Sequence, residues 1–417
     1  MGTAVRGRRV GTAVRVEPPG AEVPHTHDDL YERLREAVRR RADGLWGTAL
    51  ALHADPEYAF AEHRAAALLT GELAGAGFEV RRGVAGMPTA FTASAGRGRP
   101  VVALLLEYDA LPGLGHACGH NLIAAAGLGA ALAVREVLPA DAGTVLAVGT
   151  PAEEGGGGKA LEVEAGVFDG VDAALMFHPG VHDWTHAVLT AQEQYRVAFH
   201  GRAAHPTGDP EHGIDALAAL VELFNVLSAL GRRLPAASHV QGIVTVGGTA
   251  TNIVPDLAEG LFGLRALTTA ELDRLAEQLR TCAEGVATAT GTTVTVERAT
   301  VRYEHFRDNA VLSGRFAAHL ARAGTVLTPP RPGVLLGSSD IGNVSARVPA
   351  VHPFVAIMDE SGSDHTPEFA AAAASPRARS VLPAVTWALA CTAADVLLDA
   401  GLRRAAWEQH GATDGTR

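Results

Sequence analysis

Apolar and polar positions follow a helical period over the first long segment of the chain. From about Asp28 to Leu73, apolar residues recur every three or four positions with charged residues between them, which predicts amphipathic helix. Two short runs, Val101 to Leu106 and Thr144 to Gly149, are apolar throughout, and a helical stretch from Asn121 to about Val137 separates them. Uniformly apolar strands are typical of a parallel sheet covered on both faces. The first part of the chain therefore predicts an α/β unit.

The middle of the chain has a different rhythm. Strands and helices are predicted there in the order β-α-β-β-α-β, which is the ferredoxin-like pattern with an antiparallel sheet. The six elements are Tyr195 to His200, Ile214 to Leu230, Val240 to Val246, Gly260 to Leu267, Ala270 to Thr288 and Thr293 to Arg298. We expect this smaller α+β layer to be inserted into the larger α/β unit.

The pattern of the larger unit resumes after Tyr303, with an apolar strand from Val348 to Ile357 and a last helix from about Ser375 to Leu402. The predicted organisation has four parts. They are a flexible leader over 1–27, a discontinuous α/β domain over 28–190 and 300–405, the insert over 191–299, and a tail over 406–417 that looks disordered after Trp407.

Composition narrows the class of protein. The chain has 417 residues, 47% of them hydrophobic, and a formal net charge of -11. Its length exceeds what one core usually serves, and its charge argues against nucleic acid or an anionic membrane as the main partner. Three distant cysteines form no disulfide framework. No targeting segment or run of membrane-spanning length is visible, so we expect a cytoplasmic protein.

Residues that carry chemistry gather just after the predicted strands. In an open parallel sheet, ligands bind beyond the carboxyl ends of the strands, where the loops converge. Such ends hold Glu107, Asp109, Cys118, His120, Glu153, Glu154 and His178, and His365 follows the late strand. A set of thiolate, imidazole and carboxylate ligands suits zinc or a similar metal.

Each of these residues also has a simpler interpretation. Cys118 could be a packing residue, although a helix N-terminus would lower its pKa and favour a thiolate. Glu153 and Glu154 could be a solvated acidic pair. On an extended segment, however, neighbouring side chains point in opposite directions, so one could bind metal while the other carries protons. His178 alone could be a satisfied core histidine.

Other hydrolase classes account for fewer of these residues. Cys118 with a histidine, or Ser339, could be a nucleophile, but neither lies in a Gly-x-Ser-x-Gly turn. A phosphate-binding loop is absent from the sequence, because Lys159 follows the glycine run without a Ser or Thr after it. A two-metal site explains the paired acids and the histidines together.

Five motifs resemble those of the aminoacylase and carboxypeptidase G type of dinuclear metal amidohydrolases. They are similar above all to the branch of hippurate, indoleacetyl-amino-acid and aminobenzoyl-glutamate hydrolases. The motifs are Glu107-Tyr-Asp-Ala-Leu-Pro112, His116-Ala-Cys-Gly-His-Asn121, Pro151-Ala-Glu-Glu-Gly155, Gly201-Arg-Ala-Ala-His-Pro206 and Asp364-His-Thr-Pro367. The resemblance runs from about Asp28 to Leu402. Asn121, where hippurate hydrolases usually have Asp, favours the aminobenzoyl-glutamate hydrolases and related dipeptidases.

The resemblance implies a zinc-peptidase-like α/β domain and a role for each matched residue. Two divalent ions would be bound, zinc first, with manganese, cobalt or nickel as alternatives. The implied ligands are Cys118, His120, Glu154, His178 and His365. Glu153 would be the general base, and Asp109 and Glu107 would support the ligands, Glu107 standing where other branches carry a histidine ligand.

The insert would act as a lid and as the surface of a homodimer. His205 would reach the partner's site to polarise the scissile carbonyl, while Asn252 and Arg265 would hold the substrate carboxylate. The expected reaction is hydrolysis of the amide bond of an N-acyl amino acid, an aminobenzoyl-glutamate-like compound or a dipeptide. The alternative is a catalytically impaired, metal-binding sensor or partner protein of the same fold, for which the unusual Glu107 is the main support.

Overall fold

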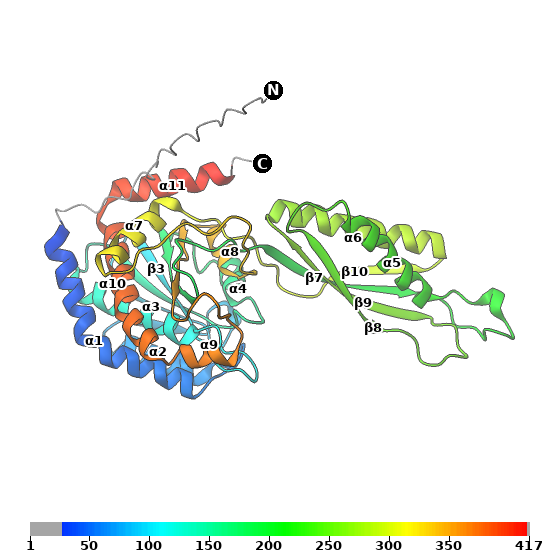
Figure 1. The fold of residues 1–417 in the computed structure, drawn as a ribbon, viewed down its shortest axis with the longest axis horizontal. Coiled ribbons are helices and arrows are strands. Elements are labelled where there is room, and N and C mark those ends of the chain that lie inside the picture. Colours follow the sequence, from blue (N-terminus) through cyan, green and yellow to red (C-terminus); the bar gives the residue numbers. More distant parts are fainter. Residues whose placement is uncertain (1–26, 415–417) are drawn as a thin grey trace, which may run out of the picture.

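The computed structural model describes residues 27–414, so nearly all of the predicted leader and residues 415–417 lie outside the described part. Two bodies are joined by a narrow neck (Figure 1). Each has a hydrophobic core of its own, one built from residues of 31–189 and 306–406, the other from 191–287. We call them the main body and the insert.

A six-stranded sheet forms the centre of the main body, in the order β1-β2-β4-β3-β5-β11. Its strands are β1 (Glu79–Arg82), β2 (Phe91–Gly96), β3 (Val101–Glu107), β4 (Thr144–Thr150), β5 (Ala173–Leu175) and β11 (Ala350–Val351). β3 pairs parallel with β4 and β5, β5 pairs parallel with β11, and β1 and β2 add an antiparallel edge. The predicted α/β class with a mainly parallel sheet is confirmed. Glu107 pairs with Thr150, so β3 and β4 end level.

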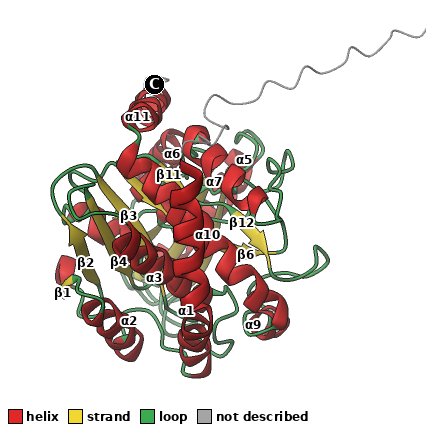
Figure 2. Ribbon diagram, turned by 90° about the vertical axis from the view of Figure 1, so that its left-hand side faces the viewer, coloured by secondary structure: helices red, strands yellow, loops and turns green. Residues whose placement is uncertain are grey.

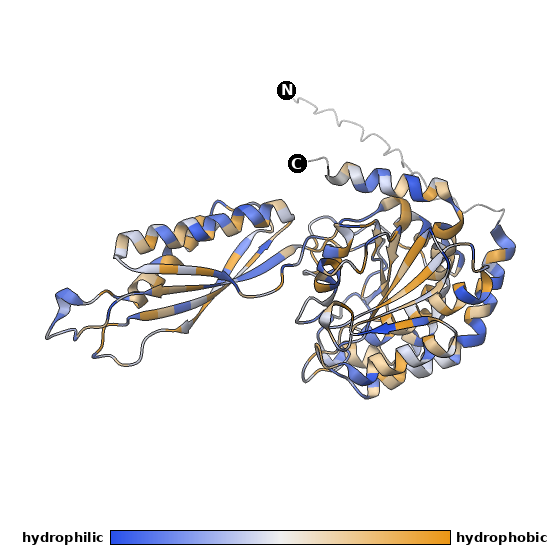
Figure 3. Ribbon diagram, turned by 180° about the vertical axis from the view of Figure 1, so that it is seen from behind, coloured by the Kyte–Doolittle hydropathy of each residue, from blue (hydrophilic) through white to orange (hydrophobic). Residues whose placement is uncertain are grey.

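Helices cover this sheet. α1 (Asp28–Ala54), α3 (His120–Val137) and α10 (Pro376–Leu398) pack on one another, and α3 lies against β3 and β4 (Figure 2). The strands of the central sheet are mostly hydrophobic (Figure 3). The smaller elements are α2 (His63–Gly75), η2 (Val84–Gly86), α4 (Gly158–Glu164), α7 (Ala310–Arg322), α8 (Ile341–Ser345), α9 (Pro367–Ala372), α11 (Ala400–Asp414) and a two-stranded parallel sheet of β6 (His178–Gly180) and β12 (Phe354–Ala356).

Prolines divide two elements that the apolar pattern predicts as continuous. The helix expected from Asp28 to Leu73 is two helices, because Pro56 disfavours helical backbone at the residue before it and the chain re-enters a helix only at His63. The strand expected from Val348 to Ile357 is split into β11 and β12 around Pro353. The proline has no N–H to donate to a continuing ladder.

Two expectations about the C-terminal part are wrong. The tail does not become disordered after Trp407, because α11 continues to Asp414. Its buried Leu402 and Ala406 pack on the core, and His410 bonds the carbonyl of Ser345. One segment does reach membrane-spanning length, since α10 is long and apolar enough by composition. However, 78% of its most apolar window is buried in the fold, as in the core helix of a globular protein.

The insert consists of β7 (Ala191–His200), η3 (Pro210–His212), α5 (Ala216–Gly231), β8 (His239–Val246), β9 (Leu257–Ala266), α6 (Thr269–Thr290) and β10 (Thr293–Arg298). Its strands and long helices follow the predicted β-α-β-β-α-β order. The sheet is antiparallel throughout, in the order β10-β7-β9-β8, and α5 and α6 pack on it. β8 is therefore an edge strand. The end of β7 next to the neck is hydrophilic (Figure 3).

Candidate metal centre and active site

The predicted metal ligands converge at the carboxyl edge of the central sheet. Cys118 lies in the loop before α3, and His120 is the first residue of that helix. Glu154 lies in the turn after β4, His178 begins β6, and His365 lies in the loop before α9. The amide of His365 donates to the carbonyl of Ala117 at 2.9 Å. Segments that are far apart in the sequence are thus held together around one point.

Three overlapping groups of side chains have ligand atoms within 4.8 Å of one another. They are Cys118 with His120 and His178, Cys118 with Glu154 and His365, and His120 with Glu153 and Glu154. Cys118 Sγ is 3.5 Å from His178 Nε2, and His365 Nε2 is 3.4 Å from Glu154 Oε2. All five predicted ligands, together with Glu153, form one cluster. We call it the ligand cluster.

The cluster fits divalent cations by its donor atoms. His120 is fully buried, and its Nε2 atom has no hydrogen-bond partner among the described residues. The Glu154 Oε1 atom is in the same condition. Buried polar atoms without partners carry a free-energy cost, which a bound cation would remove. Thiolate, imidazole and carboxylate are also the donors that zinc prefers.

Asp109 orients two members of the ligand cluster. Its Oδ1 lies 2.9 Å from His120 Nδ1, and its Oδ2 accepts a 2.9 Å bond from the backbone N–H of Glu154. A carboxylate on Nδ1 turns the other ring nitrogen toward a metal. Burial alone would lower the pKa of His120, but the charges of Asp109 and Glu107 raise it well above its ordinary value.

Glu107 belongs to a buried ion group that the sequence did not reveal. Lys159 Nζ lies 2.6 Å from Glu107 Oε1 and 2.7 Å from Asp340 Oδ1, and all three side chains are almost completely buried. Burial raises the pKa of Glu107, but the charges of Lys159 and His120 outweigh it and lower that pKa to about 2. Glu107 Oε2 stands 3.5 Å from His120 Nε2. Glu107 thus lies between Lys159 and the His120 side of the ligand cluster.

Two local expectations about the cluster are wrong. The pKa of Cys118 is raised well above its ordinary value, not lowered, because the thiol is buried and close to the Glu154 carboxylate. A bound cation would reverse this by stabilising the thiolate. Glu153 and Glu154 stand in a tight turn, not on an extended segment. The turn is closed by the amides of Gly156 and Gly157, which both donate to the carbonyl of Ala152.

A cavity of about 500 Å³ opens on the ligand cluster and extends to the neck. Glu153, Glu154 and His365 line one part of it, and Arg265 and Ser338 line another. Burial and the charges of Glu107 and Asp340 raise the pKa of Glu153 well above its ordinary value. The sequence indicated nothing for Ser338, Gln192, Gln194 or Tyr303, which also line the cavity.

Arg265 on β9 reaches this cavity from the insert. It is partly buried, and its Nη1 donates to Ser338 Oγ at 3.0 Å. Across residues 27–414, no carboxylate lies within ion-pair distance of its guanidinium. An unpaired guanidinium facing a cavity is suited to a carboxylate ligand.

His205 and Asn252 do not line this cavity. Both are exposed in the outer loops of the insert. The Nδ1 atom of His205 accepts bonds from the amides of Thr207 and Gly208 at 3.2 and 3.0 Å. These two bonds hold the imidazole ring through Nδ1, so its Nε2 atom is not used by them.

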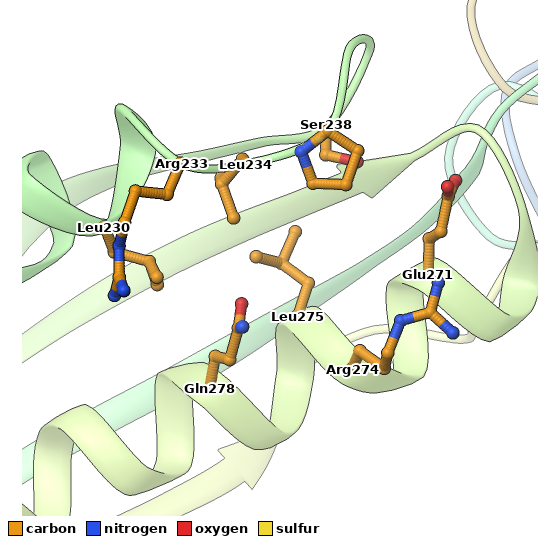
Figure 4. Close-up of a pocket in the computed structure, with 9 residues that line it drawn as sticks. Leu230, Arg233, Leu234, Ser238, Glu271, Arg274, Leu275 and Gln278 are labelled. Carbon is orange, nitrogen blue, oxygen red and sulfur yellow. The ribbon is translucent and has the colours of Figure 1, made fainter.

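A second hollow lies within the insert, between the end of α5 and the start of α6. Its volume is about 300 Å³, and Figure 4 shows the side chains that line it. Its walls combine leucines with two exposed arginines, Arg233 and Arg274. None of the predicted site residues lines it, so the chemistry belongs to the cavity at the ligand cluster.

Comparison with known proteins identifies the class. Residues 103–384, more than half of the chain, match the model of peptidase family M20/M25/M40. The chain belongs to this family. The predicted activity, metal-dependent hydrolysis of amide bonds, is thereby confirmed, and the sensor alternative has no separate support.

The chain is also similar to individual proteins of known activity. The chain is 35% identical to the Xaa-Arg dipeptidase of Mus musculus, over 93% of this chain and 94% of the relative. It is 38% identical to one component of the p-aminobenzoyl-glutamate hydrolase of Escherichia coli, over 64% of this chain and 58% of the relative.

Solved structures share the fold. A putative aminohydrolase from methicillin-resistant Staphylococcus aureus superimposes with a TM-score of 0.72 at 23% identity, over 85% of this chain and 99% of that one. A dinuclear metal-binding peptidase of the M20 family from Bacillus subtilis gives a TM-score of 0.63 at 21% identity, over 84% and 98%.

Proposed function

We propose that this chain is a two-metal amidohydrolase for small linear amides that carry a free carboxylate next to the scissile bond. The observation that carries this proposal is the cavity, in which the ligand cluster and the unpaired Arg265 face the same space. Dipeptides and aminobenzoyl-glutamate-like compounds, named for two relatives, have this chemistry. The metal is proposed to be zinc because the cluster includes a thiol.

Each member of the site has a proposed task. Cys118, His120, Glu154, His178 and His365 hold the ions, which when bound lower the pKa of a water and polarise a carbonyl. Glu153 takes the proton of the attacking water and returns it to the leaving nitrogen. Arg265 holds the substrate carboxylate, and Asp109 and Glu107 keep His120 in its orientation.

The insert is proposed to be the lid and the dimer surface. β8 is an edge strand that exposes Ile243 (60%), Val244 (50%) and Val246 (36%), and α5 beside it exposes Val221 (48%) and Val226 (38%). A long hydrophobic edge invites pairing with a second chain. A homodimer would cover it, and would bring the outer loops of one subunit, with His205 and Asn252, to the partner's cavity.

Mixing two inactive variants tests this arrangement. His205→Ala retains Glu153, and Glu153→Ala retains His205, so a hybrid dimer has one complete site. With random exchange, half of the dimers are hybrid and half of their sites are complete, so about a quarter of wild-type activity returns. As a control, mixing Glu153→Ala with the double variant Glu153→Ala/His205→Ala should restore no activity, because no subunit then carries Glu153. Equal inactivity of both mixtures would contradict a shared site.

A substrate panel tests the reaction itself. Protein reconstituted with zinc, manganese, cobalt or nickel is assayed with ninhydrin on dipeptides, N-acyl amino acids and aminobenzoyl-glutamate. We expect turnover of amides with an adjacent free carboxylate and a kcat/KM at least about ten- to a hundredfold lower for the matching carboxamides, because Arg265 then has no anion to bind. Equal turnover of acid and amide forms would contradict the proposed carboxylate contact. A cytoplasmic location stays a prediction.

A further inference from the structure

Three left-handed residues surround the candidate active site. Phe60, Ala152 and His365 have φ angles of 62°, 61° and 56°. This conformation costs a non-glycine residue about 1–2 kcal/mol, and persists only where the surroundings hold it. Phe60 and His365 line the cavity, and Ala152 directly precedes Glu153. Something must therefore hold Ala152.

A single carboxylate, Glu62, holds two of these three residues. Its Oε1 accepts the backbone N–H of Ala152 at 2.9 Å and that of Phe60 at 3.0 Å. Its Oε2 accepts the hydroxyl of Thr89 at 2.8 Å. Glu62 is completely buried, so these bonds are shielded from water.

Glu62 does not serve the helix it precedes. It occupies the N-cap of α2, yet its side chain makes no capping bond. The Glu57 carboxylate does that work, accepting the amides of Arg64 and Ala65 at 2.8 and 2.9 Å. Helix capping therefore does not explain why the Glu62 carboxylate points toward Ala152 and Phe60.

The Glu62 bonds fix the turn that carries Glu153. Ala152 is the first residue of that turn, and the hydroxyl of Tyr303 donates to the carbonyl of Glu153 at 3.0 Å. The metal side of the turn has a separate anchor, because the amide of Glu154 donates to Asp109. The Phe60 ring packs directly against this turn at Gly156. A Cβ added at that glycine would stand only 2.3 Å from the Cε2 atom of the ring.

We infer that Glu62 is a positioning residue for Glu153, acting through the backbone of Ala152. The inference rests on the proposed role of Glu153 as the proton carrier. It predicts that loss of Glu62 moves the Glu153 carboxylate while Glu154 and the other ligands stay in place. A misplacement of about 1 Å in a catalytic group can lower the rate roughly a hundredfold.

The test compares Glu62→Ala and Glu62→Gln with Thr89→Val as the matched control. The Ala variant should lower kcat by about a hundredfold, leaving KM and bound metal near wild type. Gln keeps an oxygen for both amides and can donate to Thr89, so its kcat should stay within roughly tenfold. The Val variant removes the third bond of Glu62 without touching Ala152, and should keep wild-type kcat. Glu62→Asp, which retains the charge with a shorter reach, replaces the Ala variant if that one fails to fold.

Hydrogen exchange gives a readout that does not depend on a substrate. Amides of 152–157 should exchange faster in Glu62→Ala than in wild type, and at the wild-type rate in Thr89→Val. Unchanged exchange in this segment, a kcat loss equal to that of Thr89→Val, or a loss of metal parallel to the loss of kcat would each overturn the inference. If wild-type protein hydrolyses no substrate, the proposed function fails, and the exchange rates alone decide whether Glu62 holds the turn.

Discussion

The carboxyl edge of the main sheet and the outer loops of the insert each carry part of the proposed active site. The two regions differ in how deeply their functional side chains are buried. At the sheet edge, His120, Glu107 and Asp109 are buried and held by several bonds each. In the insert, His205 and Asn252 are exposed and do not line the cavity at the ligand cluster. One chain brings the ligand cluster and Glu153 together, whereas in the proposed dimer a second chain would supply His205 and Asn252 to complete the substrate site.

The largest expected effect comes from the buried half. Glu153→Ala should lower kcat by about a hundredfold to ten-thousandfold while the variant binds as much metal as wild type. Steady-state kinetics and elemental analysis measure both. Glu164→Ala, an exposed acid on the following helix, is the control and should behave as wild type. Activity of Glu153→Ala within a few fold of wild type would remove the proposed base.

The exposed half should show a nearly comparable loss. His205→Ala removes the proposed donor to the carbonyl oxygen and should lower kcat by about a hundredfold to a thousandfold, with metal content unchanged. His212→Ala, an exposed histidine of the same outer region, controls for disturbance of the loops. A His205→Ala variant with normal kcat would mean that the two halves do not cooperate.

Arg265 lies between the two regions, and its loss should act mainly on binding. Arg265→Ala should lower kcat/KM by about ten- to a hundredfold, since bonds to charged groups contribute about 1.5–3 kcal/mol. Most of the change should appear in KM. Arg196→Ala, an exposed arginine on the neighbouring strand β7, is the control. A fall confined to kcat would contradict a carboxylate-binding role.

The smallest effect on catalysis is expected far from both regions. Asp395 accepts bonds from Tyr31, Arg315 and His319 in the core of the main body. Asp395→Asn should leave kcat unchanged, yet lower the free energy of unfolding by about 3 kcal/mol, as when a buried pair is broken.

The Asp395 contribution should also depend on pH. Burial raises the pKa of Asp395, but His319 and Tyr31 outweigh it and lower it below its ordinary value. A group whose pKa is lower in the folded state stabilises the fold above its unfolded pKa of about 3.9, and less as pH falls through the folded pKa. Urea unfolding of metal-free protein between pH 3 and 6 should therefore show a shallower pH dependence below pH 4 in Asp395→Asn. Parallel curves for the two proteins would contradict this.

The sequence predicted those site residues whose position depends on the carboxyl ends of the strands. Glu107, Asp109, Glu153, Glu154 and the ligand histidines follow apolar strands, and parallel strands bring their ends to one edge whatever the loops do. The order of elements in the insert followed from periodicity in the same way.

What the sequence did not predict depends on pairs of distant residues. Nothing in local spacing brings Lys159 to Asp340, or Glu62 to Ala152, because those contacts arise only when whole segments pack. The elements divided at Pro56 and Pro353 show that an apolar pattern continues across a proline although the backbone does not. The helix over the tail likewise depended on burial of Leu402 and Ala406.

The central claim is that Cys118, His120, Glu154, His178 and His365 hold divalent ions beside Glu153. Anomalous diffraction from crystals of zinc-loaded protein, recorded on both sides of the zinc absorption edge, tests this most directly. Two zinc peaks are expected within coordinating distance of these five side chains. Zinc bound elsewhere, or a fully loaded crystal with no peak at these side chains, would contradict it.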